Sequence, residues 1–346
     1  LLKTHGREHQ RTRWMMRPGS AALRGRGLVA GFAATVLCGA ALAETSPAEW
    51  LQRMSVAVEQ ADYSGTVVRI HNGQVQTLRV VHSYQDGRVS EKLESLDGAG
   101  REIIRAGDEV HCILPESRMV LVEQQINQEG LFGRLAVQTD ALTRSYDVAI
   151  EDYERVVGRP SVRLAIRPRD HFRFGHRLWL DKASALPLRR QVVGTGGDIV
   201  EEMRFAEITI GKPIPASAFR PSMDIEGFTW VRHAEETEGQ GGINPTGFEA
   251  REVPSGFRLV SAGNERFPDS EGEVAHIVYS DGVASVSVFV EAGRSAAGEL
   301  EGASRIGAAY AYGTVVNGHQ VTVIGEVPGH TVRMIANSLA TASEGE

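Results

Sequence analysis

Residues 66–82 read TVVRIHNGQVQTLRVVH, and this stretch decides how the first part of the chain folds. Two runs rich in β-branched residues flank Asn72-Gly73. Both central positions of a type I′ turn need a positive φ, and Asn-Gly is the pair that adopts this turn most readily. The stretch therefore predicts a β-hairpin in which 66–71 pairs with 75–82.

Short β-rich runs of the same kind continue as far as Ile210. Tight turns such as Asp86-Gly87 and Gly196-Gly197 separate them. Consecutive strands joined by tight turns predict an antiparallel meander, and no alternation of strands with helices suggests a doubly wound sheet. The further predicted strands are 88–96, 102–105, 109–114, 119–123, 146–157, 162–167, 176–181, 188–193 and 200–210.

One amphipathic helix is predicted ahead of these strands. Ser46-Pro47-Ala48-Glu49 is a capping box with proline at the first helical position, and the apolar residues from Trp50 to Ala61 follow at helical spacing. A sheet of this size twists and curls, so the helix is expected to lie on its concave face. We predict a mainly β (α+β) fold that begins with a half-open antiparallel β-barrel over a helix. The apolar mouth of such a barrel is a common ligand site.

The stretch 127–142 interrupts the strand pattern and contains Leu131, Phe132 and Leu135. One interpretation is a flap over the mouth of the half-barrel, with these three side chains as candidate ligand contacts. The other interpretation is an ordinary connecting helix.

A second, smaller α+β unit is predicted after a polar linker. The linker contains EETEGQGG at 235–242, which has almost nothing to bury. Asp281-Gly282 and Asn317-Gly318 then predict two hairpins with two-residue loops, and a closing helix follows Pro328. The predicted domains are the half-barrel at 44–226, the linker at 227–252 and the small domain at 253–346; the predicted strands of the last are 273–280, 283–291, 305–316 and 319–326.

Residues 1–43 have the pattern of a cleaved signal peptide: a basic region, an uncharged apolar run and small residues ending in Ala41-Leu42-Ala43. We therefore expect export to the periplasm. Removal of the seven basic residues and one acidic residue of this segment lowers the formal charge from −7 to −13. An acidic mature chain argues against nucleic acid as a partner.

Cys112 is the only cysteine that remains after residue 43, so no disulfide can form within the mature chain. It lies in a predicted strand, and we expect its side chain to be buried.

No catalytic or cofactor motif is recognisable, and the sequence predicts a protein that is not an enzyme, with no cofactor and no metal. There is no glycine-rich phosphate loop, no His-Glu-x-x-His, no Gly-x-Ser-x-Gly and no cysteine pair. His171 and His176 are five residues apart, which on a strand places them on opposite faces and is wrong for one metal ion. We expect both to be solvated polar positions.

Arginines are concentrated in one predicted strand pair. They allow two interpretations. The arginines could present a patch to phosphate or to an acidic peptide, or they could pair with Asp147, Glu151, Asp152 and Glu154 on neighbouring strands. The residues concerned are Arg155, Arg159, Arg163, Arg167, Arg169, Arg173 and Arg177, with Arg189 and Arg190 soon after.

Five segments, in the same order, resemble the RseB/MucB family. They are 100–109, reading GREIIRAGDE; the stretch from LWLD at 178–181 to LPLR at 186–189; VPSGF at 253–257; YSDG at 279–282; and VIGEVP at 323–328. No one of these segments is specific by itself, but the five together are, and the resemblance covers essentially the whole mature chain.

The resemblance implies an N-terminal half-barrel similar to the lipoprotein carriers LolA and LolB. It implies a regulator that binds the periplasmic domain of an RseA/MucA-like anti-sigma factor and shields it from site-1 proteolysis. Lipopolysaccharide or lipoprotein acyl chains would relieve this shielding. The resembling segments contain no ligand contacts, so Leu131, Phe132 and Leu135 are candidate lipid contacts only through our interpretation of 127–142 as a flap. The alternative is a periplasmic lipid or lipoprotein carrier. A homo-oligomer also remains open.

Overall fold

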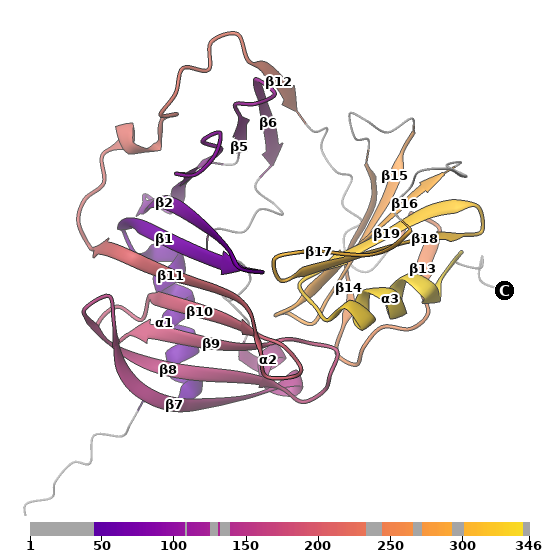
Figure 1. Ribbon diagram of the computed structural model, residues 1–346, viewed down its shortest axis with the longest axis horizontal. Coiled ribbons are helices and arrows are strands. Elements are labelled where there is room, and N and C mark those ends of the chain that lie inside the picture. The colour runs from indigo at the N-terminus through magenta and orange to yellow at the C-terminus, as the bar shows by residue number, and fades with distance from the viewer. Residues whose placement is uncertain are drawn as a thin grey trace, which may run out of the picture. The chain divides into compact units, whose positions relative to one another are not determined.

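The computed structural model describes residues 45–107, 109–124, 131, 139–232, 244–265, 272–292 and 301–341. The predicted signal peptide and the predicted linker residues 235–242 lie outside this part of the chain. Within it, most residues belong to three sheets of twelve, six and two strands (Figure 1). No helix among the described residues has both the length and the apolar character needed to cross a bilayer.

The large sheet is the predicted meander. Its strand order is β12-β6-β5-β4-β3-β2-β1-β11-β10-β9-β8-β7, and its end strands β12 and β7 are not paired with each other in the described residues. The sheet is therefore open, as the half-open barrel predicts. Its strands are β1 (Tyr63–His71), β2 (Gln74–Gln85), β3 (Arg88–Ser95), β4 (Glu102–Ala106), β5 (Glu109–Leu114), β6 (Met119–Gln124), β7 (Tyr146–Val156), β8 (Arg159–Pro168), β9 (Gly175–Asp181), β10 (Pro187–Val193), β11 (Ile199–Ile210) and β12 (Thr229–Arg232).

The hairpin of β1 and β2 has the predicted turn. Asn72 and Gly73 have φ values of 48° and 75°, which is the type I′ requirement. The register places Tyr63 opposite His82 at the far end of the hairpin. The prediction from the Asn-Gly pair is confirmed.

Helix α1 (Pro47–Gln60) packs against one face of this sheet, which we call the inner face (Figure 1). Ser46 accepts a hydrogen bond from the Glu49 amide, and the Glu49 side chain accepts one from the Ser46 amide, so the predicted capping box is present. Trp50, Leu51 and Met54 of the helix share a core with inward residues from most strands between β7 and β2. The apolar side of the helix therefore covers the inner face of the sheet and completes the half-barrel core.

The opposite, outer face carries a segment that we call the strap, residues 211–228. It includes a short 3-10 helix, η3 (Ala216–Phe219), and its apolar residues Met223, Ile225 and Phe228 pack on β4, β5 and β6. The strap leads into β12, which pairs with β6 in parallel. This strand and β13 (Phe248–Ala250) lie within residues 227–252, the predicted linker.

The smaller sheet has the order β14-β15-β16-β19-β18-β17. Helix α3 (Gly329–Ser338) follows Pro328 as predicted and buries Val332, Ile335 and Ala336 against this sheet. The strands are β14 (Arg258–Glu265), β15 (Val274–Ser280), β16 (Ser285–Ala292), β17 (Gly302–Ile306), β18 (Ala309–Val316) and β19 (His319–Gly325), and β13 pairs separately with β20 (Leu339–Thr341).

The predicted two-residue loop at Asp281-Gly282 is wrong, because the loop between β15 and β16 has four residues, 281–284. One carboxylate oxygen of Asp281 accepts hydrogen bonds from the backbone amides of Val283 and Ala284, both at 2.8 Å. The other accepts a hydrogen bond from Arg173, whose side chain is fully buried. The aspartate thus organises a wider loop around its own side chain.

The single strand predicted at 305–316 is also wrong. It is a hairpin of β17 and β18 in which Gly307-Ala308 forms the loop and Ile306 pairs with Ala309. Gly307 has a φ of 64°, and a glycine at the first loop position is typical of a type II′ turn. By contrast, Asn317 and Gly318 have φ values of 51° and 77°, so the two-residue loop predicted there is confirmed.

Candidate functional site

An apolar row crosses the inner face of the large sheet. Val80, Leu93, Ile103, Cys112 and Leu121 are paired directly, each with the next, across β2 to β6. Directly paired residues point to the same side of a sheet. Val80 is fully buried and Leu93 packs on the core that contains α1, whereas Ile103 is 39% exposed. The part of the row on β4 to β6 is therefore an apolar strip that solvent can reach.

Cys112 lies in this exposed part of the row. Its side chain is half-buried, so the prediction of a buried thiol is wrong. The reason is its position: the core around helix α1 reaches as far as Leu93 on β3 and does not include residues of β5.

A buried carboxylate lies beside the apolar row. Glu91 on β3 is 5% exposed and pairs directly with His82 on β2 and Arg105 on β4. Burial raises the pKa of Glu91, although Arg105 and a hydrogen bond from the Leu131 amide act in the opposite direction. The sequence analysis missed this residue. The signal was the alternation of β3, which places Glu91 on the same face as Leu93.

Of the three predicted ligand contacts, only Leu131 belongs to the described residues. Its side chain is half-buried against the core that contains α1, and its amide donates to Glu91 Oε1 at 3.0 Å. Phe132 and Leu135 lie outside the described residues. Helix α2 (Thr139–Ser145) occupies the end of the predicted flap region. The flap itself stays a prediction.

The two predicted histidine positions differ from each other. His171 is exposed and precedes β9, but His176 on β9 is only 7% exposed. The prediction of a solvated His176 is wrong, because β9 is covered on its inner face. In the described residues no group of three or more His, Cys, Asp or Glu side chains is placed to hold a metal ion.

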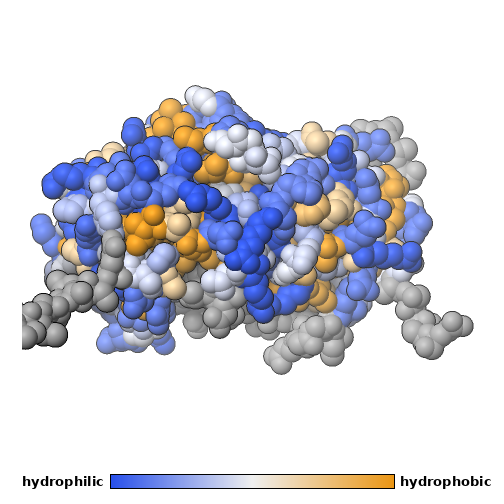
Figure 2. Space-filling model, turned by 90° about the horizontal axis from the view of Figure 1, so that it is seen from below, coloured by the Kyte–Doolittle hydropathy of each residue, from blue (hydrophilic) through white to orange (hydrophobic). Residues whose placement is uncertain are grey.

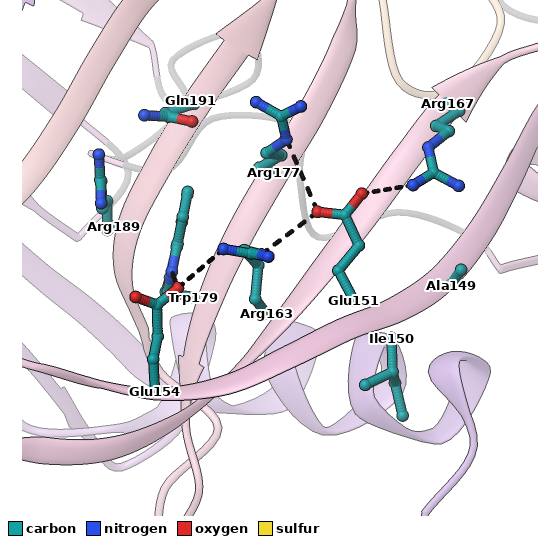
Figure 3. Close-up of a pocket in the computed structure, with 10 residues that line it drawn as sticks. All are labelled: Ala149, Ile150, Glu151, Glu154, Arg163, Arg167, Arg177, Trp179, Arg189 and Gln191. Atoms are coloured by element: carbon teal, nitrogen blue, oxygen red, sulfur yellow. Dashed lines mark hydrogen bonds and ion pairs between the residues drawn. The ribbon is translucent and has the colours of Figure 1, made fainter.

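The arginine-rich strands form a polar pocket on the outer face of β7 to β10, with a volume of about 740 Å³ (Figure 3). Glu151 lies at its centre and forms ion pairs with Arg163 at 3.2 Å, with Arg177 at 3.6 Å and with Arg167. Arg163 also reaches Glu154 at 3.1 Å. The predicted pairing of arginines with the acids of neighbouring strands is thus confirmed.

Three further arginines of this region also pair with acids. Arg159 binds Asp181 at 2.9 Å, Arg169 binds Asp147 at 2.8 Å and Arg189 binds Glu202 at 2.6 Å. Burial by itself raises the pKa of Asp181, but hydrogen bonds from Arg159 and Ser184 outweigh this and hold it below its usual range. The outer face of β7 to β10 is therefore a network of opposite charges rather than a uniformly basic patch.

The molecular face in Figure 2 is largely hydrophilic, with apolar residues in small separate groups. Large exposed apolar side chains are scattered over both sheets, among them Ile103, Ile199, Trp230 and Val260. Isolated residues of this kind are normal on protein surfaces. The apolar row is distinguished by its continuity with the core.

Comparison with known proteins places this architecture in a family. The MucB/RseB N-terminal domain matches residues 46–223, and the MucB/RseB C-terminal domain matches residues 243–340. The chain belongs to the MucB/RseB family. The family resemblance predicted from the five segments is confirmed.

Curated relatives of this MucB/RseB chain are described as regulatory proteins. The sigma factor AlgU regulatory protein MucB of Pseudomonas aeruginosa is 30% identical over 302 residues, which cover 84% of this chain and 90% of MucB. The sigma-E factor regulatory protein RseB of Escherichia coli K12 is 24% identical over 291 residues, covering 84% and 89% respectively.

Solved structures of MucB are similar over both sheets of this chain. The P. aeruginosa MucA/MucB complex and MucB in complex with MucA(peri) each match with a TM-score of 0.66 and 26% identity. Each match covers 86% of this chain and 99% of the other. The mainly β architecture predicted from the sequence is confirmed.

Proposed function

We propose that this chain is a periplasmic regulator that binds the periplasmic segment of an anti-sigma factor and shields it from site-1 proteolysis. The observation that carries the proposal is the match to MucB in complex with MucA(peri), which covers 99% of that MucB chain. A match of this extent spans nearly the whole length of the MucB chain in that complex. The family membership of residues 46–223 and 243–340 supports the same conclusion.

The direct test uses the mature chain and a fluorescently labelled periplasmic segment of MucA. We expect saturable binding by fluorescence anisotropy. We also expect slower cleavage of an anti-sigma periplasmic domain by a site-1 protease when the chain is present. A folded chain that neither binds the segment nor slows its cleavage would contradict the proposal.

We further propose that lipid relieves the shielding, and that the apolar row and Leu131 contribute to the lipid site. Each buried methylene contributes about 0.8 kcal/mol, so partial entry of one acyl chain supplies several kcal/mol. A differential affinity of about 5.5 kcal/mol is enough to reverse a two-state equilibrium almost completely. A lipid that prefers the partner-free state would therefore release the anti-sigma factor.

Thermodynamic linkage supplies the test of this relief. If lipid weakens partner binding, the bound partner must weaken lipid binding by the same factor. Lipopolysaccharide is titrated into the chain with and without the MucA segment. Equal lipid affinity in the two titrations would rule out the switch, even if both ligands bind.

Two variants locate the lipid contacts. Ile103→Ser changes the exposed part of the apolar row, and Leu131→Ser combined with Phe132→Ser changes the predicted flap. Both should weaken lipopolysaccharide binding and leave binding of the MucA segment unchanged. Ile199→Ser is the matched control, because Ile199 is 52% exposed on β11 and lies outside the row. A lipid carrier, the alternative function, would bind lipid without any effect of the MucA segment.

The periplasmic location is part of the proposal and has its own test. Cleavage after Ala43 would give a mature chain that begins at Glu44. N-terminal sequencing of the protein recovered from the periplasm should read Glu-Thr-Ser-Pro. A mature protein that retains residues around Cys38 would contradict this prediction.

A further inference from the structure

We infer that the outer-face pocket of β7 to β10 is a binding site for a phosphate monoester, centred on Arg167 and Arg177. The inference is independent of the anti-sigma partner and of the lipid site on the inner face. Figure 3 shows the two arginines directed toward Glu151 from neighbouring strands, whereas Ile150 points to the opposite face.

The distribution of charge at this point leaves Arg167 and Arg177 able to bind an additional anion. Arg167 and Arg177 have Glu151 as their one acidic ion-pair partner within the part of the chain that the structure describes. The same carboxylate also contacts Arg163, whose charge is further compensated by Glu154 at 3.1 Å and by Asp152 at 3.6 Å. Three arginines and three carboxylates are in contact here, so the cluster is neutral as a whole, but its charges are unevenly distributed: Arg163 has three carboxylate partners, whereas Arg167 and Arg177 share Glu151.

The space for that anion comes from two small residues. Ala149 on β7 pairs directly with Ala165 on β8, and Ala165 pairs directly with Arg177 on β9. Directly paired residues share a face, so the two alanines form a low floor beside Arg177. Arg163 lies two positions before Ala165 on β8, and Arg167 lies two positions after it. All three share one face of the strand, so the two arginines form walls of the pocket.

The side chains retain free donors at the rim of the pocket. Arg167 is 61% exposed and Arg177 is 38% exposed, whereas Glu151 is 16% exposed. A guanidinium has five N–H donors in a planar fork, and one shared carboxylate cannot accept them all. The remaining donors are available to an anion that enters from solvent.

Phosphate matches this arrangement better than a carboxylate does. Arginine forks bind phosphate oxygens bidentately, and a monoester carries between one and two negative charges near neutral pH. Its charge and its acceptor oxygens are grouped around one phosphorus atom, so two guanidinium groups that point to the same place can both bind them. Carboxylates of an acidic peptide carry one charge each and are separated by backbone, so they fit two guanidinium groups directed to one point less well.

The experiment measures binding of inorganic phosphate and phenyl phosphate to the mature chain by isothermal titration calorimetry. We expect saturable binding that weakens as sodium chloride is raised. Loss of one charge-assisted hydrogen bond corresponds to roughly tenfold or more in affinity. We therefore expect Arg167→Gln and Arg177→Gln each to weaken binding by about tenfold or more.

Two further variants separate charge from space and from general effects. Ala149→Leu fills the floor of the pocket and keeps every arginine, so it should also abolish binding. Arg169→Gln is the matched control: Arg169 is 53% exposed, has its own partner Asp147 and does not line the pocket. It should change phosphate affinity by less than about twofold, because Asp147 compensates the charge of Arg169 and its side chain does not line the pocket.

The source of the phosphate is decided by a flotation assay. Vesicles of phosphatidylcholine are compared with vesicles that also contain phosphatidic acid. Flotation only with phosphatidic acid identifies a lipid headgroup, and binding of phenyl phosphate without flotation identifies a soluble monoester.

Three results would overturn the inference. They are the absence of saturable phosphate binding, equal weakening by Arg169→Gln, and binding of hexaglutamate as tight as that of phenyl phosphate. Binding of the MucA segment by the same variants is measured in parallel, so that a failure of this site is not confused with a failure of the proposed function.

Discussion

Lys92 and Glu102 form a buried ion pair on the outer face of the large sheet, with Lys92 Nζ 3.0 Å from Glu102 Oε2. Their side chains are 7% and 0% exposed. Lys92 also donates to the Arg220 carbonyl at 2.9 Å, and the Glu102 carboxylate accepts the Ser222 amide. The pair therefore attaches the strap to β3 and β4 and completes the small core under the strap.

Removal of one partner of this pair should be strongly destabilising. Glu102→Ala leaves the Lys92 charge buried without its counter-ion, and we expect a loss of about 3–5 kcal/mol in the free energy of unfolding. The double variant Lys92→Met/Glu102→Leu removes both charges and should recover most of that loss. Urea unfolding monitored by circular dichroism measures both. A double variant no more stable than Glu102→Ala would contradict this account.

Asp281 should tolerate substitution much less well than Asp86, although each begins an Asp-Gly pair. Asp281→Asn removes the charge that compensates the buried Arg173, while Asp170 still contacts that arginine. We expect a loss of about 1.5–3 kcal/mol, the usual range for hydrogen bonds to charged groups. Asp86→Asn lies in an exposed hairpin turn with a φ of 53° and should cost less than about 0.5 kcal/mol. Equal unfolding free energies for the two variants would show that the Arg173 contact contributes little.

His176 should make the protein less stable as the pH falls. Burial, together with the nearby Arg190, lowers the pKa of His176 to about 3. In the unfolded chain its pKa is about 6.5, so between these values the unfolded state binds one more proton. The free energy of unfolding should therefore decrease by about 1.4 kcal/mol for each pH unit below about 6.5.

Urea unfolding at pH 7, 6 and 5 tests this contribution. His176→Gln should remove a decrease of about 1.4 kcal/mol per pH unit in the free energy of unfolding. His171→Gln, at an exposed position, should keep this pH dependence. An unchanged slope in His176→Gln would show that the buried histidine does not titrate as described.

Gly318→Val should strain the hairpin of β18 and β19. Gly318 has a φ of 77°, and no atom lies within 4 Å of the position that a Cβ would take. The cost is therefore backbone strain rather than a clash, and we expect about 1–3 kcal/mol. Asn317→Gly keeps a residue that accepts positive φ and is the control. An unchanged urea midpoint for Gly318→Val would mean that the turn does not require glycine.

The hairpins show how far local sequence could predict the fold. Asn72-Gly73 and Asn317-Gly318 were predicted because positive φ is a property of those residues themselves, independent of distant contacts. Asp281-Gly282 has the same kind of composition but forms a wider loop, in which one carboxylate oxygen of Asp281 accepts hydrogen bonds from the Val283 and Ala284 amides. The other carboxylate oxygen accepts a hydrogen bond from Arg173. The partner is 108 residues away, so no local pattern could have indicated it.

The candidate sites likewise combine features that the local sequence predicts with features that only the tertiary structure decides. The alternation of strands and the crowding of arginines were visible in the sequence, and pairing with acids on neighbouring strands was one of the two interpretations that they allowed. Only the register of β7, β8 and β9 decided that Arg167 and Arg177 share Glu151 beside two alanines, and only the end of the α1 core at Leu93 decided that Cys112 is half-buried. Turn and strand preferences act over a few residues of backbone, whereas pockets and burial depend on which distant strands pair and where the packed core stops.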